Sequence, residues 1–105
     1  MSYNRYAKLM RNGKICKMPP ITLNKNATDA FETYSKDNSS LGDISYKHYH
    51  DPNYDWLILL ANKEIADLEY QIPDNAVLRI PYPLDVAIQD YESKIEQYDI
   101  LYGLD

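Results

Sequence analysis

The sequence predicts a single α+β domain, with a strand–helix–helix–strand module between an N-terminal arm and a C-terminal helix. Apolar residues recur at spacings of three and four over residues 41–61 and again after residue 84, which is typical of helices that bury one face. Aromatic and β-branched residues gather at 30–34 and 77–80, between polar residues and prolines, which favours strands. With 105 residues, 45% of them hydrophobic, the chain has room for one modest core.

Composition and charge argue against several classes of function. The formal net charge is −5, so the concentrated basic surface that nucleic-acid binding needs is missing. Cys16 is the single cysteine, which rules out an internal disulfide framework and suits a reducing compartment. Positive charges interrupt residues 5–17, so we expect no signal peptide, and the longest apolar run, residues 56–61, is too short to span a bilayer. We therefore expect neither a nucleic-acid nor a membrane partner.

The first 20 residues predict an arm that precedes the main module. Asn12-Gly13 is a strong hairpin signal, because both central residues of a type I′ turn need positive φ, and we expect a small hairpin or a strand with a turn over residues 7–17. Pro19-Pro20 then breaks regular structure and forces an extended path. The expected division is an arm at residues 1–20, a module at residues 21–83 and a C-terminal packing helix at residues 84–105.

The first half of the module predicts strands followed by a capped helix. A short strand is expected at residues 21–23 and a longer one at 30–34. Ser40 is expected to cap the following helix, with Asp43 three residues on in a capping-box position. Because Gly42 weakens this helix, we expect it to be short. Its buried face would hold Leu41, Ile44, Ser45, His48 and Tyr49.

The second half of the module predicts a buried helix and a closing strand. Asp51-Pro52 is a start signal, since Asp caps a helix and Pro at the first helical position loses no hydrogen bond. Residues 54–61 are apolar nearly all round, so the helix should be buried and should end at Asn62. Asn75 is expected to take the left-handed conformation in a turn. The closing strand follows at residues 77–80, and the prolines beyond it stop it.

This order of elements, with these residues, resembles the LysM family. The likeness is closest at residues 49–62 (YHDPNYDWLILLAN), which are similar to a Y-g-D-p-x-x-x-W-x-I-x-x-x-N segment of LysM-like tail proteins of tailed bacteriophages, including baseplate wedge proteins. Residues 73–81 (PDNAVLRIP) are similar to the family's final p-G-q-x-L-x-I-P strand, with Asn75 at the position of the glycine. The family's G-D-T-L start is replaced by Ser39-Ser40-Leu41, with Gly42-Asp43 on the other side of the leucine.

The resemblance implies a non-enzymatic structural component of a phage virion tail or baseplate. Such a protein would be assembled in the host bacterial cytoplasm, in multiple copies in a ring-like assembly, through contacts with other tail or baseplate subunits and without a cofactor. The alternative is a peptidoglycan-binding module, and a bacterial cytosolic adaptor is a third possibility. In glycan-binding LysM domains the loop before the first helix and the loop after the second form the sugar groove. Here that groove would comprise Ser39, Ser40, Leu41, Asn62, Glu64 and Ile65.

The most regular pattern of the chain follows Pro83 and predicts a long helix. The helix would end at Gly103 and be roughly 25 Å long, which is more than a compact module needs to close its core. Two interpretations stay open: its apolar stripe packs on the module, or part of it docks on a neighbouring subunit, which the tyrosines favour because interface cores are rich in Tyr. The stripe has the four–three spacing of a packing seam and consists of Leu84, Ile88, Tyr91, Ile95, Tyr98 and Tyr102, our candidate partner-binding residues.

No residue pattern indicates catalysis or a metal site. The three glycines are scattered, so a glycine-rich phosphate loop cannot form. His48 and His50 would point about 200° apart on a helix, which is a poor geometry for one shared metal ion. The acidic residues after residue 63 fall at polar positions, which a solvated face explains better than an acid–base pair. For Trp56 two interpretations remain: a core position, or the border of a groove in which it stacks on a partner.

Overall fold

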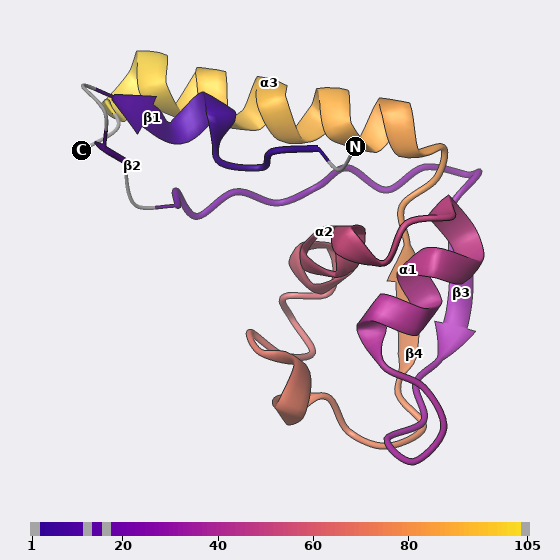
Figure 1. Ribbon diagram of the computed structural model, residues 1–105. Coiled ribbons are helices and arrows are strands. Elements are labelled where there is room, and N and C mark those ends of the chain that lie inside the picture. Colours follow the sequence, from indigo (N-terminus) through magenta and orange to yellow (C-terminus); the bar gives the residue numbers. More distant parts are fainter. Residues whose placement is uncertain (1–2, 12–13, 16–17, 104–105) are drawn as a thin grey trace.

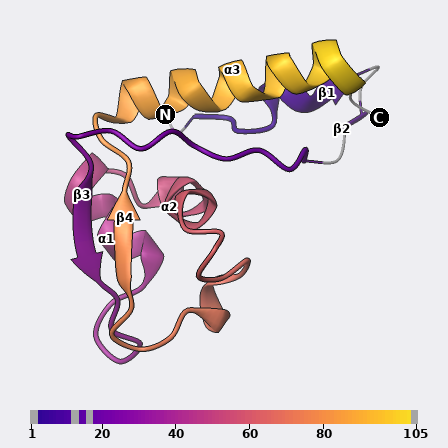
Figure 2. The ribbon, with the colours of Figure 1, turned by 180° about the vertical axis from the view of Figure 1, so that it is seen from behind.

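The computed structural model describes residues 3–11, 14–15 and 18–103 and has an α+β fold. Its longest element, helix α3 (Leu84–Tyr102), lies across the top of the molecule in Figure 1, and the N-terminal segment runs along it. The helices and strands of residues 30–80 form a lower part beneath one end of α3, as the reverse view in Figure 2 also shows. Within the described residues, no helix has both the length and the apolar composition that crossing a membrane requires.

The lower part is built from two strands and the two helices between them. These are β3 (Ala30–Thr33), α1 (Leu41–Tyr49), α2 (Asp55–Ala61) and β4 (Val77–Ile80), in chain order. The strands pair antiparallel, with Ala30 opposite Ile80 and Thr33 opposite Val77. Helix α1 lies against one face of this sheet, in front of it in Figure 1 and behind it in Figure 2. The strand pairing therefore closes residues 30–80 into one unit.

The N-terminal segment contains the expected hairpin. After a short 3-10 helix, η1 (Ala7–Leu9), strand β1 (Met10–Arg11) pairs antiparallel with β2 (Lys14–Ile15). This pairing confirms the hairpin, whereas its turn residues, Asn12-Gly13, lie outside the described residues, as does Cys16.

The strand expected at residues 21–23 is wrong. The segment runs extended but pairs with no strand of the described chain, because side chains bind its carbonyl groups instead. Lys63 Nζ donates to the Ile21 carbonyl at 3.1 Å, and Lys94 Nζ donates to the Thr22 carbonyl at 2.8 Å. Ile21 and Leu23 still enter the core, at 6% exposure each. The segment is thus fixed by side-chain contacts rather than by a sheet.

The start and the buried face of α1 follow the sequence. Ser40 Oγ accepts the backbone N–H of Asp43 at 3.2 Å, and Asp43 Oδ2 accepts the backbone N–H of Ser40 at 3.1 Å, which confirms the capping box. The buried residues of the helix are Leu41, Ile44, Ser45 and Tyr49, while His48 lies at the border of the buried face.

Helix α2 also begins and ends where the sequence indicates. The Asp51 side chain caps a 3-10 turn, η2 (Pro52–Tyr54), that leads directly into α2, and Asn62 ends the helix. A further 3-10 turn, η3 (Glu69–Gln71), precedes the closing turn. There Asn75 has φ 67° and donates its N–H to the Tyr34 carbonyl at 2.7 Å, which confirms the left-handed conformation.

One core joins the arm, the lower part and α3. Its members include Leu9 from η1 at 1% exposure, Ile58 from α2 and Ile80 from β4 at 0%, and Tyr91 from α3 at 0%. Because these residues belong to a single cluster, the arm and α3 pack onto the lower part and do not stand apart from it.

The end of α1 generates a stability prediction. His50 occupies the left-handed C-cap, with φ 60°, a conformation that glycine adopts without the steric cost of a Cβ atom. We expect His50→Gly to raise the free energy of unfolding by about 0.5–1 kcal/mol and His50→Ala to lower it, with His50→Asn between the two. Urea unfolding of the three variants checks this order, and equal stability of the Ala and Gly variants would contradict it.

Candidate functional site

The apolar stripe of α3 faces the chain's own core. Tyr91 and Ile95 are 0% and 1% exposed, and the Tyr91 hydroxyl donates to the Arg5 carbonyl at 2.7 Å. Burial is the main cause that raises the pKa of Tyr91, to about 12, so the hydroxyl remains a donor. Leu84, Ile88 and Tyr98 are partly buried against the same core, and only Tyr102 is largely exposed, at 75%. In this structure a partner could not contact Tyr91 or Ile95, because intramolecular packing already covers both.

Both flanks of α3 are held by the N-terminal segments. On one flank Tyr3 and Lys8 bind the helix, and on the other flank the extended segment around Asn24 binds it. Burial, and next the hydrogen bond to the Glu92 carboxylate, raises the pKa of Tyr3. The contacts are Tyr3 to Glu92 at 2.5 Å, Lys8 to Glu96 at 2.8 Å, Asn24 N–H to Asp90 at 2.7 Å and Lys94 to the Thr22 carbonyl at 2.8 Å.

The residues expected to form a glycan groove are divided between two places. Ser40 is engaged as the cap of α1, next to half-buried Ser39, and Leu41 is 2% exposed and borders a hollow beside Trp56. The loop residues after α2 border a different pocket, near the exposed face of β3 and β4. That pocket is lined by Asn62, Glu64, Ile65, Lys25, Phe31, Val77 and Arg79.

Asn62 is occupied by structural hydrogen bonds. Its amide nitrogen donates to the carbonyls of Ile58 at 2.7 Å and Arg79 at 2.8 Å, and its amide oxygen accepts the N–H of Arg79 at 2.9 Å. At 3% exposure, this side chain is buried with both donors in use. It therefore completes the free edge of β4 and offers little hydrogen bonding to a sugar.

A buried ion pair lies beside Asn62. The Arg79 guanidinium donates to Asp29 Oδ2 at 2.9 Å and to the carbonyls of Leu23 at 3.3 Å and Ala61 at 3.2 Å. The Asp29 side chain is 1% exposed. Our reading of the sequence missed this pair, although one signal was present: an arginine between apolar residues of a buried strand requires an acidic partner.

The pKa of Asp29 is lowered by its hydrogen bonds. Burial, the largest single effect, raises the pKa of this carboxyl group, but the backbone N–H groups of Asn26 and Tyr82 and the Arg79 guanidinium together outweigh burial and lower it. The ionised carboxylate is thus the form that the fold favours at neutral pH.

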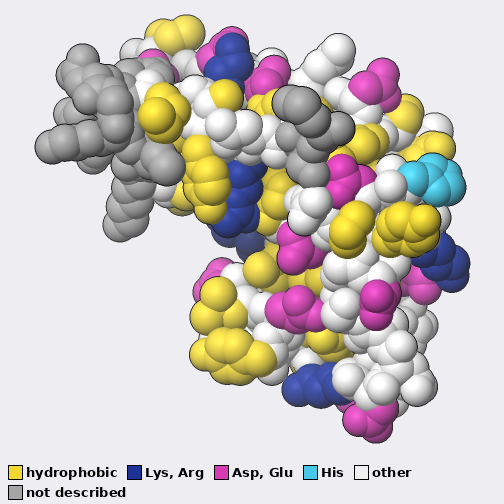
Figure 3. All heavy atoms as spheres, in the orientation of Figure 1, with side chains coloured by type: hydrophobic (Ala, Val, Ile, Leu, Met, Phe, Trp, Pro, Cys, Tyr) yellow, Lys and Arg dark blue, Asp and Glu magenta, His cyan; other side chains and the backbone are white. Residues whose placement is uncertain are grey.

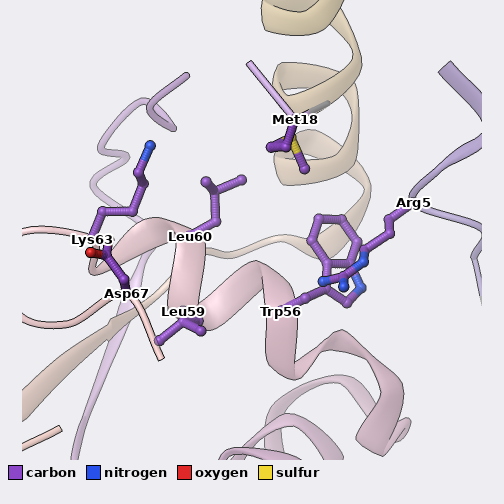
Figure 4. A pocket seen from close by; sticks show the side chains of 7 residues that line it. All are labelled: Arg5, Met18, Trp56, Leu59, Leu60, Lys63 and Asp67. Atoms are coloured by element: carbon purple, nitrogen blue, oxygen red, sulfur yellow. The ribbon is translucent and has the colours of Figure 1, made fainter. Parts of the chain in front are cut away.

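Trp56 packs on the core and also borders a groove, the two positions that the sequence left open. One side of its ring packs on the core, with the Tyr91 ring at 4.9 Å between centroids, and the Tyr3 ring stacks on it at 6.3 Å. The Arg5 guanidinium lies 5.6 Å from its centroid, within cation–π range. The half-buried ring also borders a groove of about 180 Å³, shown in Figure 4. The groove is lined by Arg5, Met18, Trp56, Leu59, Leu60, Lys63 and Asp67.

This groove has the size of one or two side chains and a mostly apolar floor. Figure 3 shows a hollow between the upper and lower parts of the molecule, in which basic and hydrophobic side chains lie close together. The sequence could not locate this groove, since Arg5 and Met18 come from the arm and Leu60 from α2. Such a surface can hold an apolar side chain of a partner.

His48 and His50, which the sequence analysis considered as metal ligands, make separate contacts. His48 Nε2 is 3.1 Å from Glu32 Oε1, and the exposed His50 ring lies edge-on to Tyr46 at 6.5 Å. Among the described residues, no group of three or more His, Cys, Asp and Glu side chains could hold a metal ion.

Comparisons with protein-family models, curated proteins and solved structures found no match for this chain.

The buried ion pair predicts a specific pH dependence. Asp29→Asn should lower the free energy of unfolding at pH 7 by about 3 kcal/mol, because it leaves the Arg79 guanidinium buried without its counter-charge. The folded-state pKa of Asp29 is lowered, so its contribution is present above the unfolded pKa near 4 and is lost as pH falls through the folded value. The difference between wild type and variant should therefore shrink as pH falls below about 4. Urea unfolding at several pH values measures it, and a constant difference would show that ionised Asp29 contributes nothing.

Proposed function

We propose that the chain is a non-enzymatic structural component of a bacteriophage virion tail or baseplate, with a LysM-like βααβ module. The order β3, α1, α2, β4 with antiparallel pairing of the outer strands supports this, because it is the order that the resemblance implies. The left-handed Asn75 lies where the family pattern has glycine, which also supports the alignment of the closing strand.

The observation that carries the proposal is the exposed apolar end of α3. Three consecutive side chains there are open to solvent: Ile100 at 83%, Leu101 at 71% and Tyr102 at 75%. Consecutive large apolar residues on a surface are typical of protein–protein contact sites. Burying such a side chain against a neighbour would contribute roughly 1.5–3 kcal/mol before ordering costs. The sequence analysis proposed the whole apolar stripe as the partner-binding surface. We now propose the end of the helix instead, which includes Tyr102 of that stripe.

A second apolar surface supports assembly on more than one side. Phe31 on β3 and Val77 on β4 are 65% and 59% exposed and border the same pocket. Two separate contact surfaces on one subunit allow rings to form, because a heterologous contact needs two different patches. Multiple copies in a ring-like tail or baseplate assembly would use both surfaces.

The peptidoglycan alternative has less support. Of its expected groove residues, Leu41 borders one pocket, whereas Asn62, Glu64 and Ile65 border another, and the Asn62 amide makes its hydrogen bonds within the fold. Sugar binding would then depend on other residues, such as Trp56.

Two substitutions at the helix end test the assembly role. Leu101→Asp and Tyr102→Asp should leave the thermal midpoint within a few degrees of wild type, because both side chains are exposed. We expect both variants to be lost from purified particles, measured by mass spectrometry of virions after complementation. Asn38→Asp is the matched control, since it adds the same charge at an exposed position that is distant in sequence from the end of α3. Wild-type incorporation of folded Leu101→Asp and Tyr102→Asp would overturn the role of this surface.

A sedimentation assay separates assembly from glycan binding. Purified protein mixed with insoluble peptidoglycan should stay in the supernatant after centrifugation. Saturable co-sedimentation that free chitooligosaccharide competes away would instead favour the glycan-binding module.

A further inference from the structure

The outer face of α3 carries an uncharged line of residues along its whole length. This crest consists of Val86, Gln89, Ser93, Gln97 and Ile100, all of which are exposed. At 100° per residue they fall within an arc of about 80°, centred on Ser93 and opposite the buried Tyr91 and Ile95. Among the residues that the structure describes, none covers this face of α3, so the crest is exposed.

Four charged residues of α3 that flank the crest bind partners in the same chain. On one flank Glu92 binds Tyr3 and Glu96 binds Lys8. On the other flank Asp90 binds Asn24, and Lys94 binds the Thr22 carbonyl and lies 3.7 Å from Asp90. A helix face that meets only water usually carries charged residues. The crest of this acidic chain has none, which suggests that it meets protein.

The sequence of the crest reads nearly the same in both directions. Ser93 is its midpoint, with Gln89 and Gln97 four residues away on either side and Val86 and Ile100 seven residues away on either side. A two-fold axis through Ser93 would place a second copy of α3 antiparallel on the first. Val86 would then meet Ile100 of the other copy, and Gln89 would meet Gln97.

We propose that the crest of α3 is a self-complementary contact between two copies of this chain. Apolar residues meet apolar residues at both ends, and the glutamine amides can bond each other as donor and acceptor. The small side chain at Ser93 permits close approach of the helices where they cross, within the usual interaxial distance of about 8–10 Å. A different partner protein would not require the two halves of the crest to match.

The charged residues on either side of the crest make the strength of this contact depend on salt concentration. On the flank that holds Asp90 and Lys94, the two-fold axis brings Lys94 of each copy near Asp90 of the other. On the opposite flank the same axis brings Glu92 near Glu96 of the other copy, and each copy carries a net charge of −5. Repulsion therefore outweighs attraction at low ionic strength, and added salt should strengthen the contact.

The contact is weak when it acts alone. The crest from Val86 to Ile100 is about 21 Å long and roughly 10 Å wide, which is less than the ~800 Å² per partner of a standard stable interface. Several such contacts in an assembly would reinforce one another. The inference rests on the proposed assembly function for its setting, but the purified chain alone can test it.

A cysteine cross-linking experiment tests the two-fold geometry. In a Cys16→Ser background, Ser93→Cys places one thiol at the axis, so mild oxidation should give a disulfide dimer on a non-reducing gel. Gln89→Cys alone and Gln97→Cys alone are the matched controls, since antiparallel packing holds their thiols apart. We expect each control to cross-link at least about tenfold more slowly, and an equal mixture of the two to form the mixed dimer at close to the Ser93→Cys rate. Equal rates for all three single variants, or no dimer for Ser93→Cys, would overturn the proposal.

Sedimentation velocity of the chain with its natural thiol supplies a second readout. The weight-average mass should rise with protein concentration and rise further with NaCl, and Ile100→Asp should abolish both effects while the far-ultraviolet circular dichroism stays unchanged. A purely monomeric wild type at millimolar concentration and high salt would contradict the proposal. These results are independent of virion composition, so a chain absent from virions that still forms the Ser93→Cys dimer would refute the proposed function and not this contact.

Discussion

The free edge of β4 is the constraint on which the rest of the structure depends. A two-stranded sheet leaves backbone groups without partners on each outer edge, and buried groups of this kind are costly unless they are bonded. At Arg79 the Asn62 side chain takes the place of a third strand, because it both accepts from and donates to the Arg79 backbone. Since Asn62 is also the residue that ends α2, the length of that helix and the position of β4 are fixed together.

The side chain of Arg79 extends this constraint to the N-terminal half. Its guanidinium binds the Leu23 and Ala61 carbonyls and the Asp29 carboxylate, so it joins the extended segment, the end of α2 and the start of β3. Trp56 has a comparable role on the opposite side of α2, where it meets Tyr3 of the arm and Tyr91 of α3. Helix α2 therefore connects the sheet on one side to the arm and α3 on the other, and this explains why a helix of seven residues contains two residues with no exposed surface.

Local signals predicted most of the elements, because their causes lie within a few residues. The capping box at Ser40, the turn around Asn75, which the Ala76 N–H closes on the Pro73 carbonyl at 3.2 Å, and the Gly103 cap, whose N–H donates to the Asp99 carbonyl at 2.9 Å, each involve backbone groups close in sequence. Contacts between distant segments were not predictable in this way. The extended segment failed as a strand because Lys63, from the turn after α2, and Lys94, from α3, bind its carbonyls, and neither lysine is near it in the sequence.

The stripe of α3 shows why periodicity identifies a helix but not the partner of its apolar face. The four–three spacing was right about the helix, yet the same pattern fits packing within the chain and packing between chains. What separates the two is whether the rest of the chain supplies enough apolar surface to cover the stripe. Here the chain's own core covers Tyr91 and Ile95, at 0% and 1% exposure, and the N-terminal segments also bind charged residues on both flanks. Any contact that α3 makes with an apolar or uncharged surface of another subunit must then use the helix end or the uncharged crest, because these residues stay exposed.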